Sequence, residues 1–363
     1  MTTGIIYDDI YLQHRIGTHV ESHYRLIALM DFLNEQKLFE SEDFKLIKPR
    51  KATLDQIRYV HEDSLIKEVR EVSDLAEKTG IIQSLDMDTD ISPKTYEASL
   101  YSVGGNLQAA DEILAGNIKN AFCAVRPPGH HSHTYKCAGF CIFNNVAIVA
   151  EYLFREKNIK RIALIDWDCH HGNGTQQIFY SGSESKNGEL VMFNSHQYGN
   201  FYPGSGSINE IGTGKGEGKI INYPMPPKAA DDIIPLYFNE IVSPICQEFK
   251  PEFILISAGF DTHWTDQLTD MGWTYQAPAN FLKMIKIVAK KHAHDRILLT
   301  LEGGYEVDKQ ARAVYNCLRI LNDENDRLIE EKPRKSDEAL LNYVKKKLIP
   351  ALKEKLKPFW NCF

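Results

Sequence analysis

The sequence predicts an α/β protein, built as a single three-layer αβα domain around a mainly parallel central sheet. Short, almost continuously apolar segments alternate with amphipathic ones, the pattern of a parallel sheet covered by helices on both faces. A chain of 363 residues with 43% apolar residues is long enough for a large core, because folding at this length buries about 75% of the unfolded surface. No composition break marks a boundary, so we expect residues 1–363 to form one domain.

The predicted strands are the short apolar runs. They comprise residues 4–7, 121–126, 161–168, 190–196, 220–223, 253–258 and 297–301. The predicted helices lie between them and have apolar residues at helical spacing. They comprise residues 23–36, 93–115, 145–156, 233–248, 275–294 and 307–321. The glycine-rich stretch 203–218 is expected to be a loop, because strands are predicted on both sides of it.

The C-terminal segment, residues 332–363, carries nine Lys and Arg against three Asp and Glu. Its apolar residues recur every fourth position, at Leu340, Val344, Leu348, Leu352 and Leu356. This spacing predicts a basic amphipathic helix that packs its apolar stripe on the domain and leaves the lysines in water. Proline lacks an N–H group, so a proline at position 350 is expected to bend or split that helix.

Composition and charge exclude several classes of protein. The formal net charge is −7, which argues against nucleic-acid binding and favours a basic substrate. The seven cysteines are scattered, with no CxxC pair, so neither a disulfide framework nor a cysteine-based zinc site is expected. The N-terminus does not resemble a signal peptide, and no apolar run reaches the roughly 18 residues of a membrane span. We therefore expect a cytoplasmic protein without membrane contact; a homo-oligomer is possible.

Polar residues gather where four predicted strands end. Strand 161–168 ends in Asp166 and Asp168, and His170 follows it. Strand 121–126 is followed by His130 and His131, strand 253–258 by Asp261, and strand 297–301 by Tyr305. Alternation along the strand would place Asp166, Asp168 and His170 on one side. Ligands of open parallel sheets bind outside the carboxyl ends of the strands. We therefore expect these side chains to meet at one rim.

Two carboxylates and one imidazole, Asp168, His170 and Asp261, are the predicted metal ligands. Three protein ligands with an open position for water are typical of catalytic zinc. Zinc lowers the pKa of its bound water towards about 7 and polarises a carbonyl, which indicates hydrolysis. Iron(II) in place of zinc remains an alternative.

Four further residues are candidates for the chemistry around such a metal. The tandem His130 and His131 could provide the general base and the acid for the leaving amine. Asp166 and Asn173 are expected to be their hydrogen-bond partners. Tyr305 follows two glycines, which allow a sharp turn that would bring its phenol to the oxyanion of a tetrahedral intermediate.

Together these residues resemble the histone deacetylase family, within the arginase-deacetylase fold. The likeness covers nearly the whole chain and is closest to the class II branch and its bacterial amidohydrolase relatives, since Asn173 stands where class I members usually have Asp. The motifs, in chain order, are Tyr7-Asp-Asp, His19-Val-Glu-Ser-His-Tyr-Arg25, Ile91-Ser-Pro93, Arg126-Pro-Pro-Gly-His-His131, Gly139-Phe-Cys-Ile-Phe-Asn-Asn145, Asp166-Trp-Asp-Cys-His-His-Gly-Asn-Gly-Thr175, Phe201-Tyr-Pro-Gly204, Ser257-Ala-Gly-Phe-Asp261 and Leu301-Glu-Gly-Gly-Tyr305.

The resemblance implies a zinc-dependent deacetylase acting on acetylated lysine in proteins or peptides. It implies that His131 is the general base and acid, that His130 assists electrostatically, and that Tyr305 polarises the acetyl carbonyl. Phe140 and Tyr202 would flank a tunnel for the lysine stem, and the Gly139 carbonyl would accept the substrate amide N–H.

The family also implies a structural K⁺ ion. The residues that would hold it are Asp166, Asp168, His170, Asn194 and Ser195. Asn194-Ser-His196 stands where the family commonly has Ser-Leu-His, so a side chain that faces this site is changed. Val20 replaces a common proline and affects only the shape of a loop.

Three other functions remain open at this stage. An acetylpolyamine amidohydrolase would use the same centre, although Leu268 lies where one polyamine-selective relative has an acidic gatekeeper. Asp86, Asp88 and Asp90 could form an acidic lip that attracts either cationic substrate. A two-manganese ureohydrolase would need an Asp-x-Asp where this chain has Asp261-Thr-His263. The last alternative is a binding module for acetylated ligands that has lost catalysis.

Overall fold

The computed structural model describes residues 2–185 and 188–363, and within these ranges eight parallel strands form one central sheet. The strand order is β2-β1-β5-β10-β9-β6-β7-β8. The strands are β1 (Thr3–Ile6), β2 (Phe44–Ile47), β5 (Asn120–Cys123), β6 (Arg161–Asp166), β7 (Glu189–Gln197), β8 (Ile220–Met225), β9 (Phe253–Ala258) and β10 (Ile297–Leu301). A separate two-stranded antiparallel sheet pairs β3 (Gln83–Ser84) with β4 (Asp90–Ile91).

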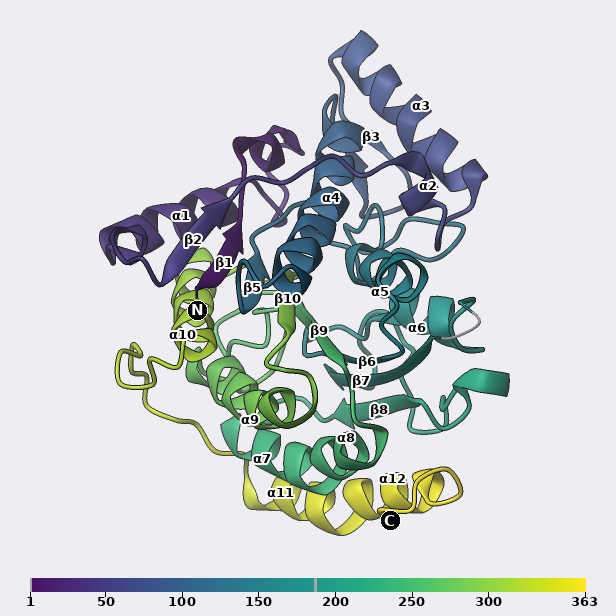
Figure 1. The fold of residues 1–363 in the computed structure, drawn as a ribbon, viewed down its shortest axis with the longest axis vertical. Helices are drawn as coiled ribbons and strands as arrows, with labels where there is room; N and C mark the ends of the chain where they lie inside the picture. The colour runs from purple at the N-terminus through teal and green to yellow at the C-terminus, as the bar shows by residue number, and fades with distance from the viewer. Residues whose placement is uncertain (1, 186–187) are drawn as a thin grey trace.

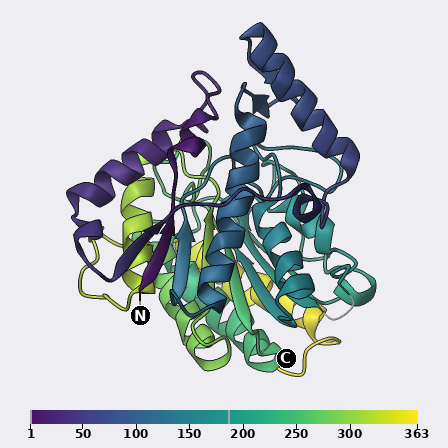
Figure 2. The ribbon, with the colours of Figure 1, turned by 45° about the horizontal axis from the view of Figure 1, so that its top comes forward.

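Helices cover both faces of the sheet, which confirms the predicted three-layer α/β fold (Figure 1). Helices α1, α10, α9, α7 and α8 form one layer, while α4, α5 and α6 lie on the other face. The helices are α1 (Tyr24–Glu35), α2 (Leu54–Ile57), α3 (Asp63–Thr79), α4 (Thr95–Leu114), α5 (Asn145–Glu156), α6 (Asn173–Phe179), α7 (Ile234–Tyr237), α8 (Ser243–Phe249), α9 (Gln276–His292), α10 (Val307–Leu321), α11 (Glu338–Tyr343) and α12 (Ile349–Leu356). Figure 2 shows α3 projecting from one end of the molecule, with both termini at the other.

All seven predicted strands are present, but the edge strand β2 was not predicted. Its sequence Phe-Lys-Leu-Ile is short, and both Lys45 and Leu46 are exposed. Because its two middle residues face solvent, β2 lacks the continuous apolar run of the central strands; the opposite edge strand, β8, is buried throughout and was predicted. The long helix α3 was also missed, although Leu65, Ile66, Val69 and Ala76 form a buried stripe at helical spacing.

Two central strands end earlier than predicted, and both endings lie at the rim. Strand β5 stops at Cys123, three residues before Arg126, whose guanidinium donates instead to the buried carboxylate of Glu21. Strand β6 stops at Asp166. The alternation expected to carry through Asp168 and His170 is therefore wrong. Those residues lie in a turn, where a side-chain oxygen of Asp168 accepts the backbone N–H of His170 over 2.9 Å.

The C-terminal segment lies outside α7 and α8 (Figure 1). Val344, Leu348, Leu352 and Leu356 are buried, and Leu340 is partly buried. The helix continues through a π-helical turn, Val344–Leu348, into α12 with Pro350 in its first turn. The wider turn accommodates a residue that has no N–H to donate.

We expect Leu352→Ala to lower the free energy of unfolding by about 2–5 kcal/mol, the usual range for truncating a fully buried leucine. The side chain of Leu352 is 0% exposed. Denaturant unfolding measures the change, and Lys346→Ala, an exposed position two turns earlier, is the control. Equal stability of the two variants would contradict the packing of this segment.

Candidate active site

Four adjacent strands bring their carboxyl ends to one rim. In the sheet order, β5, β10, β9 and β6 are neighbours, and Ser257 of β9 is in register with both Asp166 of β6 and Thr300 of β10. The segments that follow these strands carry His130 and His131, Asp168 and His170, Asp261, and Tyr305. The parallel topology therefore brings the candidate residues from four separate stretches of sequence together.

Asp168, His170 and Asp261 form a cluster that could hold a metal ion. One ligand atom from each lies within 4.8 Å of the others. Asp168 and Asp261 are buried, and the His170 side chain is 11% exposed. Nδ1 of His170 lies 2.9 Å from a carboxylate oxygen of Asp261 and 3.2 Å from one of Asp168. The other Asp168 oxygen accepts the backbone N–H of Gly303 over 2.8 Å, which holds the carboxylate in its orientation towards His170.

The charges of this cluster favour a cation. Burial, followed by repulsion from Asp168, raises the pKa of Asp261 to about 7. Burial alone would lower the pKa of His170, but hydrogen bonds to Asp168 and Asp261 raise it to about 10. Two carboxylates that share a buried site repel each other unless a positive charge lies between them. The donor set therefore fits a divalent metal with mixed nitrogen and oxygen ligands.

The two tandem histidines have different partners, as predicted. Nδ1 of His130 lies 3.0 Å from the carboxylate of Asp166, and Nδ1 of His131 lies 2.7 Å from the amide oxygen of Asn173. Burial opposes a charge on His130, but Asp166, Asp168 and Glu302 raise its pKa to about 10. Burial and the neighbouring His130 lower the pKa of His131 well below the usual value. At neutral pH His131 is therefore a neutral imidazole.

Glu302, at the start of the Glu-Gly-Gly-Tyr motif, anchors the histidine loop. One of its carboxylate oxygens accepts the backbone N–H groups of Gly129 and His130 over 2.8 and 3.2 Å. The hydroxyl of Ser257 donates to the other oxygen over 3.2 Å. Sequence reasoning assigned no role to Glu302, because its partners are backbone groups from a distant segment.

Tyr305 is positioned by two residues that the sequence did not single out. A carboxylate oxygen of Asp266 accepts the backbone N–H of Tyr305 over 2.8 Å and that of Glu306 over 3.2 Å. The guanidinium of Arg25 lies 5.1 Å from the centre of the Tyr305 ring. Burial raises the pKa of the phenol well above its ordinary value, so the hydroxyl keeps its proton and remains a hydrogen-bond donor.

The site opens into a cavity of about 350 Å³. Its lining includes the candidate residues His130, His131, Gly139, Phe140, His170, Tyr202, Leu268 and Tyr305. Asp88, expected in an acidic lip, also lines it, as does Phe201, which was given no site role. The ring of Phe201 stacks on that of His170, with centres 4.9 Å apart. The four residues expected near the substrate, Gly139, Phe140, Tyr202 and Leu268, therefore border the same space as the candidate catalytic groups.

Glycine is required at two positions around this space. A Cβ atom on Gly139 would lie 2.4 Å from the ring of His131, and the φ angle of Gly139 is +54°. A Cβ atom on Gly303 would lie 2.4 Å from a carboxylate oxygen of Asp261. Any side chain at these positions would displace His131 or Asp261.

Asn194 and Ser195 of β7 lie beside Asp166. Asn194 is in register with Asp166, and both polar atoms of its side-chain amide are buried without a hydrogen-bond partner in the described structure. The hydroxyl of Ser195 donates to the backbone oxygen of Asp166 over 3.4 Å. An unpartnered amide oxygen beside a carboxylate is a suitable ligand for a cation that prefers oxygen.

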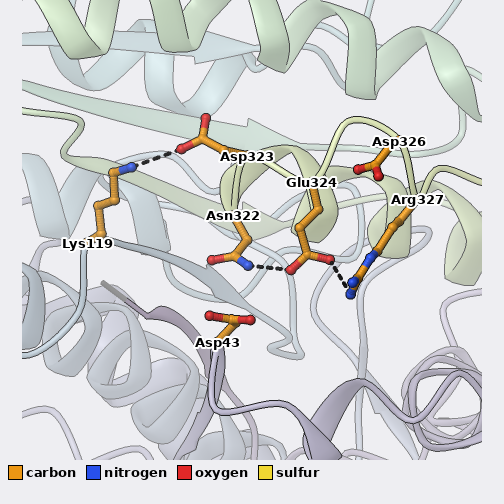
Figure 3. Close-up of a pocket in the computed structure, with 7 residues that line it drawn as sticks. All are labelled: Asp43, Lys119, Asn322, Asp323, Glu324, Asp326 and Arg327. Carbon is orange, nitrogen blue, oxygen red and sulfur yellow. Dashed lines mark hydrogen bonds and ion pairs between the residues drawn. The ribbon is translucent and has the colours of Figure 1, made fainter.

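A second hollow, of about 440 Å³, lies near the amino ends of β2 and β5 (Figure 3). Lys119 is paired with Asp323 over 3.1 Å, and Arg327 with Glu324 over 3.2 Å. Its lining within the described chain includes neither histidine nor cysteine.

All seven cysteines are free thiols, six of them buried. Within the same ranges, the chain contains no helix with both the length and the apolar composition to span a bilayer.

Comparison with known proteins agrees with this geometry. Residues 19–321 match the family described as the histone deacetylase domain. A "Probable deacetylase" of Archaeoglobus fulgidus is 39% identical over 374 residues, covering 100% of both chains. Histone deacetylase 14, chloroplastic, of Arabidopsis thaliana is 33% identical over 86% of this chain and 75% of its own. Among solved structures, an HDA15 HD domain superposes with a TM-score of 0.86 at 27% identity, covering 100% of this chain and 97% of that one.

Proposed function

Since the chain belongs to the histone deacetylase family, we propose that it is a zinc-dependent hydrolase that removes acetyl groups from lysine side chains of proteins or peptides. Hydrolase activity of the deacetylase type follows from the family; the metal, the mechanism and the substrate are our proposal. One observation supports it most strongly. His170, the neutral His131 and Tyr305 line one cavity, and His170 is clustered there with the carboxylates of Asp168 and Asp261.

Asp168, His170 and Asp261 would hold the zinc ion. The buried carboxylate pair with one imidazole suits this ion, and three protein ligands are the usual number at catalytic zinc sites, which keep one position for water or substrate. Bound zinc makes hydroxide available near neutral pH and polarises the amide carbonyl. His170 is held in place by the stacked ring of Phe201.

His131 would accept the proton of the attacking water and return it to the leaving amine. Its Nδ1 bonds to the Asn173 oxygen over 2.7 Å, so Nδ1 carries the proton and Nε2 keeps a free lone pair. His130, protonated beside Asp166, would add positive charge near the developing oxyanion. Tyr305 would donate its hydroxyl to that oxyanion.

Gly139, Phe140, Tyr202 and Leu268 would enclose the substrate stem. An aromatic and aliphatic wall suits the unbranched methylene chain of lysine, which has no polar group to satisfy before its acylated nitrogen. Gly139 would bind the substrate amide N–H through its carbonyl. The unpartnered Asn194 amide supports a K⁺ ion bound with Asp166, Asp168, His170 and Ser195.

The acetylpolyamine alternative rests on Asp88. This carboxylate lines the same cavity and accepts the backbone N–H of Gly139 over 3.2 Å, so it could attract the free ammonium of a polyamine. Leu268, also in the lining, offers such a cation no partner. A two-manganese centre has less support, because His263 bonds to Thr265 and Glu331 instead of joining the ligand cluster.

A substrate panel tests the proposal. We expect the zinc-reconstituted protein to hydrolyse acetyl-lysine peptides at least about tenfold faster, by kcat/KM, than N-acetylputrescine, which corresponds to about 1.4 kcal/mol. Longer acyl-lysine peptides complete the panel, and release of the free amine is the readout. Turnover confined to the polyamine would overturn the choice of substrate, and no turnover of any amide would overturn the proposed activity, leaving a binding module.

We propose a cytoplasmic enzyme without nucleic-acid partners, consistent with its net charge of −7, and a single domain over residues 1–363. Association into a homo-oligomer is compatible with this function.

A further inference from the structure

A third histidine, His133, lies two residues after His131 and has no role in the reaction proposed above. Its Nε2 atom lies 3.1 Å from the side-chain nitrogen of Asn173. The oxygen of the same amide lies 2.7 Å from Nδ1 of His131. The Asn173 amide is therefore placed between two imidazole rings.

The amide oxygen of Asn173 only accepts hydrogen bonds and its nitrogen only donates them. The role of one ring nitrogen, as donor or acceptor, therefore fixes the role of the ring nitrogen on the other side of the amide. When Nε2 of His133 accepts from the amide nitrogen, the amide oxygen faces His131. Nδ1 of His131 must then carry its proton, and Nε2 is free to act as a base. With the amide reversed, the nitrogen would donate to Nδ1 of His131, and the proton would move to Nε2. That tautomer has no base for water.

We propose that His133 is a positioning residue for deacetylation: as a hydrogen-bond acceptor it orients the Asn173 amide and thereby selects the tautomer of His131 in which Nε2 is the base. This role of His133 rests on the proposed function and deepens it, because His133 would act on the general base, His131, through Asn173. His133 does not line the substrate cavity.

The surroundings of His133 suit an acceptor held at a fixed position. Its backbone N–H donates to the Lys136 carbonyl over 2.9 Å, and its own carbonyl lies 2.9 Å from Nδ1 of His61. In the described structure the Nδ1 atom of the His133 ring is buried without a partner, so the bond to Asn173 is the one that orients the ring. Burial and the charge of Lys136 lower the pKa of His133 to about 4, which keeps the ring neutral at pH 7.

Among the described residues, the other groups packed around His133 form no hydrogen bond with Nε2. The Tyr135 ring lies 5.8 Å away, centre to centre. Gln177 of α6 accepts the backbone N–H of Thr134 over 3.0 Å. Lys136 is the charged group beside the ring, and its exposed side chain offers a place for a control substitution.

Four substitutions of His133 separate the acceptor from the side chain's volume. His133→Gln and His133→Glu retain an oxygen acceptor, and both should keep kcat within about threefold of the wild type. His133→Leu removes the hydrogen bond to Asn173 and should lower kcat by about tenfold at unchanged KM. This is the lower end of the roughly 10–100-fold loss of activity seen when a hydrogen bond that supports a metal site is removed. His133→Lys offers only donors and should lower kcat at least as much. Lys136→Glu controls for the added negative charge of His133→Glu.

A second readout does not depend on turnover. In zinc-loaded protein with ¹⁵N- and ¹³C-labelled histidine, the ring shifts of His131 report which nitrogen carries the proton. We expect the Nδ1–H form in the wild type and in His133→Gln, and a shift towards the Nε2–H form in His133→Leu and His133→Lys.

An unchanged His131 tautomer in His133→Leu would overturn the inference, whether or not kcat falls. Loss of activity in His133→Gln equal to that in His133→Leu would also overturn it, because both would then reflect the side chain's volume. A wild-type protein without activity on any acetylated substrate would contradict the proposed function instead, and the tautomer measurement would still decide the role of His133.

Discussion

Asp261→Ala is expected to abolish deacetylation, lowering kcat/KM by roughly 10³-fold or more, because water without a bound metal keeps a pKa near 15.7 instead of about 7. The variant removes one of two carboxylates in the ligand cluster and leaves His170 with Asp168 alone. It also removes the acceptor of the Cys169 backbone N–H. Steady-state kinetics on an acetyl-lysine peptide measures the loss, and metal analysis of the same sample should show less than one bound equivalent.

Asp308→Ala is the matched control for this change. Asp308 is a carboxylate on α10 that pairs with Lys309 and Arg312, outside the cavity. We expect it to keep the metal and to change kcat/KM by less than about twofold, since exposed ion pairs contribute little. An Asp261→Ala protein that kept wild-type turnover would show that the reaction does not use this cluster.

Tyr305→Phe is expected to lower kcat by about 10²–10³-fold, the usual effect of removing one oxyanion donor. KM should change little, because the phenol contributes mainly to the transition state. The ring remains, so its contacts with Arg25 and Phe140 are preserved. Single-turnover kinetics with the acetyl-lysine peptide separates the chemical step from substrate binding.

Tyr275→Phe provides the comparison for the loss of a hydroxyl. The Tyr275 hydroxyl donates to the backbone oxygen of Glu330, away from the reacting groups. We expect its kcat to remain within about twofold of the wild type, while its stability falls by about 1 kcal/mol for the lost hydrogen bond. A Tyr305→Phe enzyme with unchanged kcat, or with a rise in KM alone, would contradict the assigned role.

The central strands and most covering helices were predictable because burial on both faces leaves a continuous apolar run. Strand β9, with every residue buried, is such a case. Where the chain is half exposed, as in β2, the run breaks and the strand was missed. The ends of β5 and β6 were placed too late, because Arg126 and Asp168 bond to residues far away in sequence, and such bonds override local strand preference.

For the site, the sequence identifies candidate residues by their chemistry, but it does not identify the residues that hold their loops in place. Asp168, His170 and Asp261 follow apolar strands and have side chains that bind metals, so both position and chemistry single them out. Glu302 and Asp266 act on backbone N–H groups of other loops. Any acidic residue could do this, so residue type alone does not identify them. His133 could have been noticed in the sequence because it lies two residues after His131, but the role proposed for it depends on the orientation of Asn173.

Crystallography of the purified protein at the zinc absorption edge examines the proposed metal centre most directly. We expect one anomalous peak per chain, within bonding distance of Asp168, His170 and Asp261, at about 2.0–2.2 Å from nitrogen or oxygen ligands. A strong peak elsewhere, two peaks of equal height sharing these ligands, or three side chains pointing away from a common centre would contradict the one-metal hydrolase proposed for this chain.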